Sequence, residues 1–120
     1  MPVRSLNSSV LRWPDAETVV GELSRWADAL VRERSDVERV GCIGSYARGD
    51  AGPGSDLDVI VVLHDTELPF IERAATIDAT SLPVPTDLLV YTSDELARLT
   101  SESTRFGRVL REEARWAWPR

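Results

Sequence analysis

Residues 44–63 read GSYARGDAGPGSDLDVIVVL, and this stretch decides the fold. It holds a Gly-Ser pair, ten further residues and then an Asp-x-Asp motif that opens an apolar run. The run from Val59 to Leu63 is short, largely β-branched and preceded by Gly, Pro and Ser, which predicts a strand. Because alternate residues of a strand point to the same face, we expect Asp56 and Asp58 to lie side by side at the start of that strand.

Two carboxylates aimed at one point repel each other unless a cation lies between them. Their oxygen atoms suit a hard ion such as Mg²⁺, or alternatively Mn²⁺, whose coordination is completed by water and substrate phosphates. Upstream, Gly44 and Ser45 predict a tight turn into a helix N-terminus, where free N–H groups and a hydroxyl suit a phosphate. Together these features indicate phosphoryl-type transfer from a nucleotide. The alternative is a Gly/Pro-rich loop that is followed by an aspartate-capped strand.

The stretch resembles the signature of the nucleotidyltransferase fold, that of the DNA polymerase β superfamily. Its Gly-Ser-x10-Asp-x-Asp spacing is most similar to that of the minimal nucleotidyltransferases, and so is the filler Tyr46-Ala47-Arg48-Gly49. The resemblance covers about residues 37–91. It implies a site for two metal ions in which Asp56 and Asp58 are joined by a further acid from a later strand.

Asp87 is the match for that further carboxylate, in Thr86-Asp87-Leu88-Leu89-Val90. An aspartate at the start of an apolar strand is costly unless something holds it. Thr86 departs from the apolar neighbour that the family prefers, and Pro85 makes a turn cap the competing explanation. Asp78 is a poorer match, because it falls in or after a predicted helix.

The resemblance also implies the reaction. A nucleoside triphosphate, expected to be ATP, would bind with its phosphates at Gly44, Ser45 and the following helix, and Arg48 lies close enough in sequence to contact them. A salt bridge from Arg48 to Asp50 is the alternative for that arginine. The nucleoside monophosphate would pass to a hydroxyl that Asp87 orients or deprotonates, and pyrophosphate would be released.

The acceptor is expected to be a partner protein, or a substrate bound across an oligomer interface, since the residues after Tyr91 suffice for a helix or two but not for an acceptor domain. Minimal nucleotidyltransferases are often paired with a small helical HEPN-type toxin. The resemblance therefore implies an antitoxin that attaches AMP to a tyrosine of the toxin. Two other functions stay open: a catalytically silent module that neutralises a partner by contact, and a small-molecule enzyme similar to the aminoglycoside nucleotidyltransferases.

The composition predicts one globular domain over residues 1–120, with 42% hydrophobic and 28% charged residues. The net charge of −6 argues against an extended nucleic-acid-binding surface, which would need many cationic contacts to phosphates. No apolar run reaches the ~20 residues that a membrane helix needs, and the first residues lack the apolar core of a signal peptide. Cys42 is the single cysteine, so we expect no internal disulfide and a cytoplasmic location. All 14 basic residues are arginine, which excludes a catalytic lysine.

The order of the predicted elements is typical of an α/β fold with a small mixed sheet and flanking helices. Residues 1–13 are expected to be an extended or partly disordered lead-in. The predicted helices span 14–34, 45–50, 69–79, a short segment capped by Ser93, and 101–116; the predicted strands span 37–43, 56–63 and 84–91.

The end of the chain is locally basic, with six arginines and three glutamates from Arg98 to Arg120. This segment is either a solvated helix face or a surface for an acidic partner. Trp116 and Trp118 within it either anchor a partner or fold back on the core of the domain itself.

Overall fold

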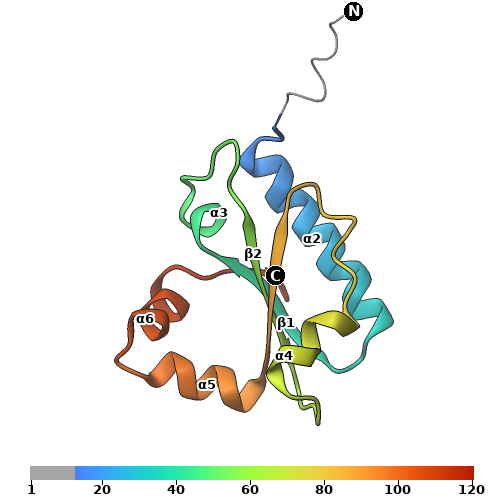
Figure 1. Ribbon diagram of the computed structural model, residues 1–120, viewed down its shortest axis with the longest axis vertical. Helices are drawn as coiled ribbons and strands as arrows, with labels where there is room; N and C mark the ends of the chain where they lie inside the picture. The colour runs from blue at the N-terminus through green and yellow to red at the C-terminus, as the bar shows by residue number, and fades with distance from the viewer. Residues whose placement is uncertain (1–12) are drawn as a thin grey trace, which may run out of the picture.

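Four strands form one mixed sheet in the computed structural model, which describes residues 13–120 (Figure 1). They are β1 (Val37–Ile43), β2 (Leu57–Leu63), β3 (Thr86–Thr92) and β4 (Arg115–Trp118). Their order across the sheet is β3-β2-β1-β4, with β2 and β3 parallel and β1 antiparallel to both of its neighbours. The predicted α/β fold is confirmed. Almost the whole predicted lead-in lies outside the described residues.

The central strand β2 has side chains that favour burial on both faces. From Val59 to Leu63 every side chain is apolar and buried, and this pattern requires cover above and below the sheet. Val59 and Val61 pack in a cluster with helix α2 (Ala16–Glu33), whereas Ile60 and Val62 pack in a second cluster on the opposite face. The sheet therefore separates two apolar cores.

Helix α2 covers the first face and begins as its sequence predicts. Asp15 caps it, because the Asp15 carboxylate accepts a hydrogen bond of 2.8 Å from the backbone N–H of Thr18. That bond also lowers the pKa of Asp15. Trp26 is buried with the core face of the helix, and its indole N–H donates to the Asp78 carbonyl at 3.0 Å.

Two shorter helices, α5 (Ser93–Ser101) and α6 (Arg105–Glu112), cover the second face. The predicted cap at Ser93 is wrong by one residue, because the N-cap of α5 is Thr92. The Thr92 hydroxyl accepts from the N–H of Glu95, and the Glu95 carboxylate accepts from the N–H of Thr92, which together form a capping box.

The predicted helix over residues 101–116 is confirmed only for α6, from Arg105 to Glu112, and its predicted bounds are wrong. The chain leaves α5 after Ser101, Thr104 caps α6 through the N–H of Gly107, and strand β4 follows. Segments this short carry little helical periodicity, and β4 is fixed by pairing with β1, which lies far away in the sequence.

The two tryptophans of β4 fold back on the domain, as the second of the two interpretations predicts. Trp118 packs against the first core and Trp116 against the second. Gly41 makes room for Trp116, since a Cβ atom at position 41 would lie 2.6 Å from that indole ring. The Arg39 guanidinium stacks on the indole ring of Trp116, 3.6 Å from the ring centroid.

The predicted helix over residues 69–79 is shorter than expected. It consists of α4 (Phe70–Arg73) and one turn of 3-10 helix, η1 (Ala74–Thr76), after which the chain extends towards β3. No helix among residues 13–120 has the length and hydropathy needed to cross a membrane.

The buried cation Arg73 holds this short segment in place. Its guanidinium forms an ion pair of 2.6 Å with Glu95 and donates to the carbonyl oxygens of Leu68 at 2.9 Å and Val90 at 3.1 Å. The ion pair and the N–H of Thr92 lower the pKa of Glu95 to about 2. One side chain therefore ties α4 both to β3 and to the start of α5.

We expect Arg73→Ala to lower the free energy of unfolding by about 2–3 kcal/mol, because two carbonyls and a partly buried carboxylate lose their donor. Urea denaturation measures this difference. Arg25→Ala is the control, since Arg25 pairs with Glu22 at the surface and its loss should cost less than about 0.5 kcal/mol. Equal effects of the two substitutions would contradict the role given to the buried network.

Candidate active site

The register of the two parallel strands brings two of the predicted carboxylates together. Asp58 of β2 pairs with Asp87 of β3, so the two residues are direct neighbours across the sheet. Residues at one level of adjacent strands present their side chains to the same face. Asp56 lies two residues before Asp58, just outside β2, and its side chain is exposed.

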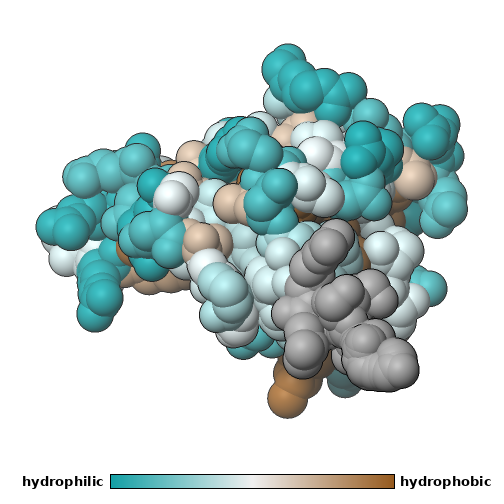
Figure 2. Space-filling view, turned by 90° about the horizontal axis from the view of Figure 1, so that it is seen from above, coloured by the Kyte–Doolittle hydropathy of each residue, from teal (hydrophilic) through white to brown (hydrophobic). Residues whose placement is uncertain are grey.

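The carboxylates share the face of the sheet that α5 and α6 cover. Ile60 and Leu89, each two residues after one of the paired aspartates, belong to the second core. Leu57 lies between the two aspartates of the motif and is fully buried in the first core. The motif therefore anchors its central leucine on one side and presents carboxylates on the other. Figure 2 looks down on the end of the molecule that carries α3 in Figure 1, where the visible surface ranges mostly from teal to white.

The electrostatics of Asp58 reflect this crowding of like charges. Partial burial raises the pKa of Asp58, and the neighbouring carboxylates of Asp87 and Asp56 raise it further. The Arg48 guanidinium acts in the opposite direction and lowers it. Among residues 13–120, Asp58 has no hydrogen bond or ion pair that would compensate its charge. The site thus stores a repulsion that a bound cation would relieve.

The turn at Gly44 lies against the Asp58 carboxylate. Gly44 has φ of 79°, which favours glycine, and a Cβ atom built on it would come within 2.7 Å of Asp58 Oδ2. The antiparallel partner of Asp58 is Ile43, the residue just before this turn. The two halves of the motif are therefore in contact although ten residues separate them in the sequence.

The short helix α3 (Ser45–Arg48) follows that turn, as predicted, and ends slightly earlier than Asp50. Its N-cap is Gly44, which offers no side-chain acceptor, so the first N–H groups of the helix are not capped by it. Ser45 is partly exposed at the same place. These groups can contact a phosphate next to the carboxylates, and this role stays a prediction.

Arg48 makes the salt bridge that was considered as the alternative to a phosphate contact. Its guanidinium lies 3.2 Å from Asp50 and 3.5 Å from Glu113, just after α6. All three groups are at least partly exposed, and such pairs are weak. Arg48 therefore stays free to exchange these partners for a phosphate. The sequence pattern did not single out Glu113, because its contact depends on how α6 packs.

Tyr46 packs beneath the loop that joins the two halves of the motif. Its side chain is buried, with 2% of its surface exposed, and its hydroxyl accepts from the Trp13 indole N–H at 3.2 Å. The same hydroxyl lies 3.5 Å from the carbonyl of Ser55, the residue before Asp56. The Ser55 hydroxyl accepts from the N–H of Gly52. This network holds the loop from which Asp56 projects.

The described residues fit a metal ion only in part. Within residues 13–120, no three or more His, Cys, Asp or Glu side chains are grouped so that they could hold an ion by themselves. Mg²⁺ is usually held by one or two carboxylates together with substrate phosphates and water. Asp58 and Asp87 provide such a pair, with oxygen atoms that suit Mg²⁺ or Mn²⁺, and Asp56 is near enough to shift the pKa of Asp58.

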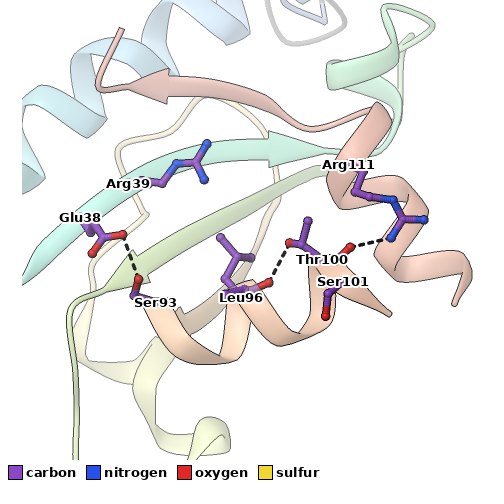
Figure 3. A pocket seen from close by; sticks show the side chains of 8 residues that line it. Glu38, Arg39, Ser93, Leu96, Thr100, Ser101 and Arg111 are labelled. Carbon is purple, nitrogen blue, oxygen red and sulfur yellow. Dashed lines mark hydrogen bonds between the residues drawn. The ribbon is translucent and has the colours of Figure 1, made fainter. Parts of the chain in front are cut away.

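A groove of about 480 Å³ lies elsewhere on the second face, between β1, α5 and α6 (Figure 3). Ser93 donates to Glu38 on one side of it, and Arg111 donates to the Thr100 carbonyl on the other. Arg39 also lines it. None of the predicted site residues contributes to this groove.

Comparisons with known proteins agree with the architecture. A family described as "Nucleotidyltransferase domain" matches residues 23–115. The fold is similar to that of a candidate nucleotidyltransferase from Sulfolobus solfataricus, with a TM-score of 0.56 and 21% identity over 88% of this chain and 87% of that one. It is also similar to a chain in a crystal structure of a toxin-antitoxin with AMP-PNP, with a TM-score of 0.53 and 22% identity over 79% of this chain and 72% of that one. Curated proteins give no significant match.

Gly44→Ala should destabilise the protein more than Gly49→Ala. Both glycines have positive φ, but their backbone conformations differ: Gly49 is in the left-handed helical region, where alanine costs about 1 kcal/mol, whereas Gly44, with ψ of −154°, is in a region that is essentially restricted to glycine. Only at position 44 does the new methyl group also collide with Asp58, whereas nothing lies within 4 Å of a Cβ atom at position 49. Chemical denaturation of the two variants compares their free energies of unfolding. Equal losses would mean that the turn does not abut the carboxylate.

Asp58→Asn should leave the protein at least as stable as the wild type at pH 7, measured in EDTA. The raised pKa of Asp58 means that its charge costs stability once the pH exceeds that pKa, and this cost is absent in acid. The advantage of the asparagine variant should therefore shrink as the pH falls towards 3. Asp78 is the control with the opposite sign, because hydrogen bonds from Thr80 lower its pKa. The Asp78→Asn variant should be less stable than the wild type at pH 7, and this difference should shrink as the pH falls towards 3.

Proposed function

The chain belongs to the nucleotidyltransferase domain family, and from that premise we propose that it transfers AMP from ATP to a hydroxyl group of a partner protein. One observation carries the proposal: Asp58 lies beside Asp87 across two parallel strands, and the turn at Gly44 lies against Asp58. A phosphate bound at Gly44 and Ser45 would thus be next to the paired carboxylates.

The residues of the site take the following roles in this proposal. Asp56, Asp58 and Asp87 would hold Mg²⁺, or Mn²⁺, which neutralises phosphate charge and lowers the pKa of an acceptor hydroxyl. Gly44 and Ser45 position the β- and γ-phosphates.

Arg48 and Asp87 complete the site. Arg48 leaves Asp50 and Glu113 to contact phosphate. Asp87 orients the acceptor hydroxyl or takes its proton. The new bond joins the hydroxyl oxygen to the α-phosphorus, the bond from the α-phosphorus to the bridging oxygen breaks, and pyrophosphate leaves with the electron pair.

A partner protein is the acceptor that we favour. The fold is similar to that of a chain in a toxin-antitoxin structure that contains AMP-PNP, which supports both an adenine nucleotide and a protein partner. We propose a HEPN-type toxin with a tyrosine acceptor, so that the chain acts as an antitoxin. The alternative is that the chain forms a homo-oligomer whose interface completes a pocket for the acceptor, with the same carboxylates in the same roles.

We expect the purified chain, incubated with α-³²P-labelled ATP, Mg²⁺ and an extract of its own source, to yield one labelled protein band on a denaturing gel. Asp56→Asn and Asp87→Asn should each abolish the label, since each removes a carboxylate from the site. Asp78→Asn is the matched control and should label normally, because the Asp78 side chain is exposed and, among the described residues, its carboxylate bonds only to Thr80.

Three results would contradict the proposal in different ways. Label in a small molecule would indicate a small-molecule nucleotidyltransferase. No transfer with any nucleoside triphosphate, with Mg²⁺ or Mn²⁺, would favour a silent binding module. Normal labelling by Asp56→Asn and Asp87→Asn would show that the assigned carboxylates are wrong.

A further inference from the structure

The large apolar side chains that are exposed among residues 13–120 all lie in one short stretch. They are Leu68, Phe70 and Ile71, of which Ile71 has 86% of its surface exposed. They belong to the end of the connection that leaves β2 and to the first residues of α4. A single exposed apolar side chain is ordinary, but several together are typical of an interaction surface. We call these three side chains the α4 patch.

The backbone beneath the α4 patch is held in a fixed position. The Arg73 guanidinium donates to the Leu68 carbonyl at 2.9 Å and to the Val90 carbonyl at 3.1 Å. The Phe70 ring packs on Tyr91 of β3, with 5.2 Å between the ring centroids. A surface that is already ordered loses little conformational freedom on binding, which favours a role in recognition.

The charged residues of the stretch that carries the patch have one sign. Asp65, Glu67 and Glu72 are all exposed, and no basic residue occurs from position 65 to position 72. Arg73 follows directly, but its guanidinium is buried and paired with Glu95, so it does not offset these charges at the surface. The patch is therefore apolar at its centre and acidic at its edge.

We propose that the α4 patch docks a partner protein that presents an apolar side chain flanked by lysine or arginine. Such a surface matches both the apolar centre and the acidic edge, and opposite charges also speed the encounter. Nucleic acid and anionic membranes carry the wrong charge for this surface. A second copy of the chain in a symmetric dimer would place acidic edge against acidic edge.

The patch is far from the paired carboxylates. Asp58 lies at the start of β2, and the connection that carries the patch leaves its other end; a strand of seven residues spans ~20 Å. Figure 1 accordingly shows α3 and α4 at opposite ends of the molecule. Docking at the patch does not require contact with the candidate active site, and the proposal does not rest on the proposed function.

Photocrosslinking from the full-length chain identifies the partner. The photoreactive amino acid p-benzoylphenylalanine replaces Ile71 in cells of the source, and the crosslinked protein is identified by mass and then purified. Capture alone is not sufficient support. The affinity of the purified protein for the wild-type chain is compared with its affinity for Ile71→Ser and for the double variant Glu67→Lys/Glu72→Lys.

We expect Ile71→Ser to weaken binding at least about tenfold, as the loss of a central apolar contact does. The double variant should bind more weakly than the wild type at low salt, and its salt dependence should be reversed, because added salt screens the new repulsion between like charges. Glu33→Lys, which changes an exposed glutamate on α2, is the charge control and should bind like the wild type. Circular dichroism verifies that each variant is folded.

Three outcomes would overturn the proposal. The first is a crosslink to a second copy of the chain, with self-association that Ile71→Ser abolishes. The second is the absence of any crosslinked species above the background of the same amino acid placed at Glu33. The third is a captured protein that binds Ile71→Ser as tightly as the wild type. The labelling assay with ATP reports on the carboxylates separately, so failure of one proposal is distinguishable from failure of the other.

Discussion

The parallel pairing of β2 with β3 is the constraint on which the candidate site depends. It places Asp58 beside Asp87, although two carboxylates at one level of a sheet repel each other. The alternation of Leu57 and Asp58 specifies this register. A shift by one residue would turn Leu57 out of the first core and bring the Asp58 carboxylate into it. Burial of an uncompensated carboxylate costs more than repulsion from the exposed Asp87, so the sheet can tolerate the observed pairing.

Two acidic residues illustrate how differently the same fold treats a charge. Glu95 accepts hydrogen bonds from Arg73 and from the N–H of Thr92, and its pKa falls to about 2. Asp58 faces other carboxylates, and its pKa rises. A compensated carboxylate of the first kind holds elements together. An uncompensated one costs stability and is expected where a ligand supplies the missing charge.

The sequence predicted what local patterns determine. The strand over residues 37–43 agrees with β1, and the Gly-Ser turn and the Asp-x-Asp strand lie where the motif indicated. The pairing of Asp58 with Asp87 depends on a register that no local pattern contains. Strand β4 was missed for the same reason, because its place is set by β1 and by the space that Gly41 leaves for Trp116. The exposure of Ile71 likewise follows only from how α4 packs.

The two ends of β2 lead to surfaces of different chemical character. The start of the strand presents carboxylates and an open phosphate turn, whereas the connection at its other end presents the α4 patch on a backbone that Arg73 fixes. Because no side chain is shared between the two surfaces, a protein docked on the patch and a nucleotide bound at the carboxylates need not compete. Coupling between them would need an element with two alternative arrangements, whereas β2 is paired along both edges in one register and buried on both faces. Binding at the two ends should therefore be nearly independent, and a large mutual effect would indicate that the docked partner itself reaches the carboxylates.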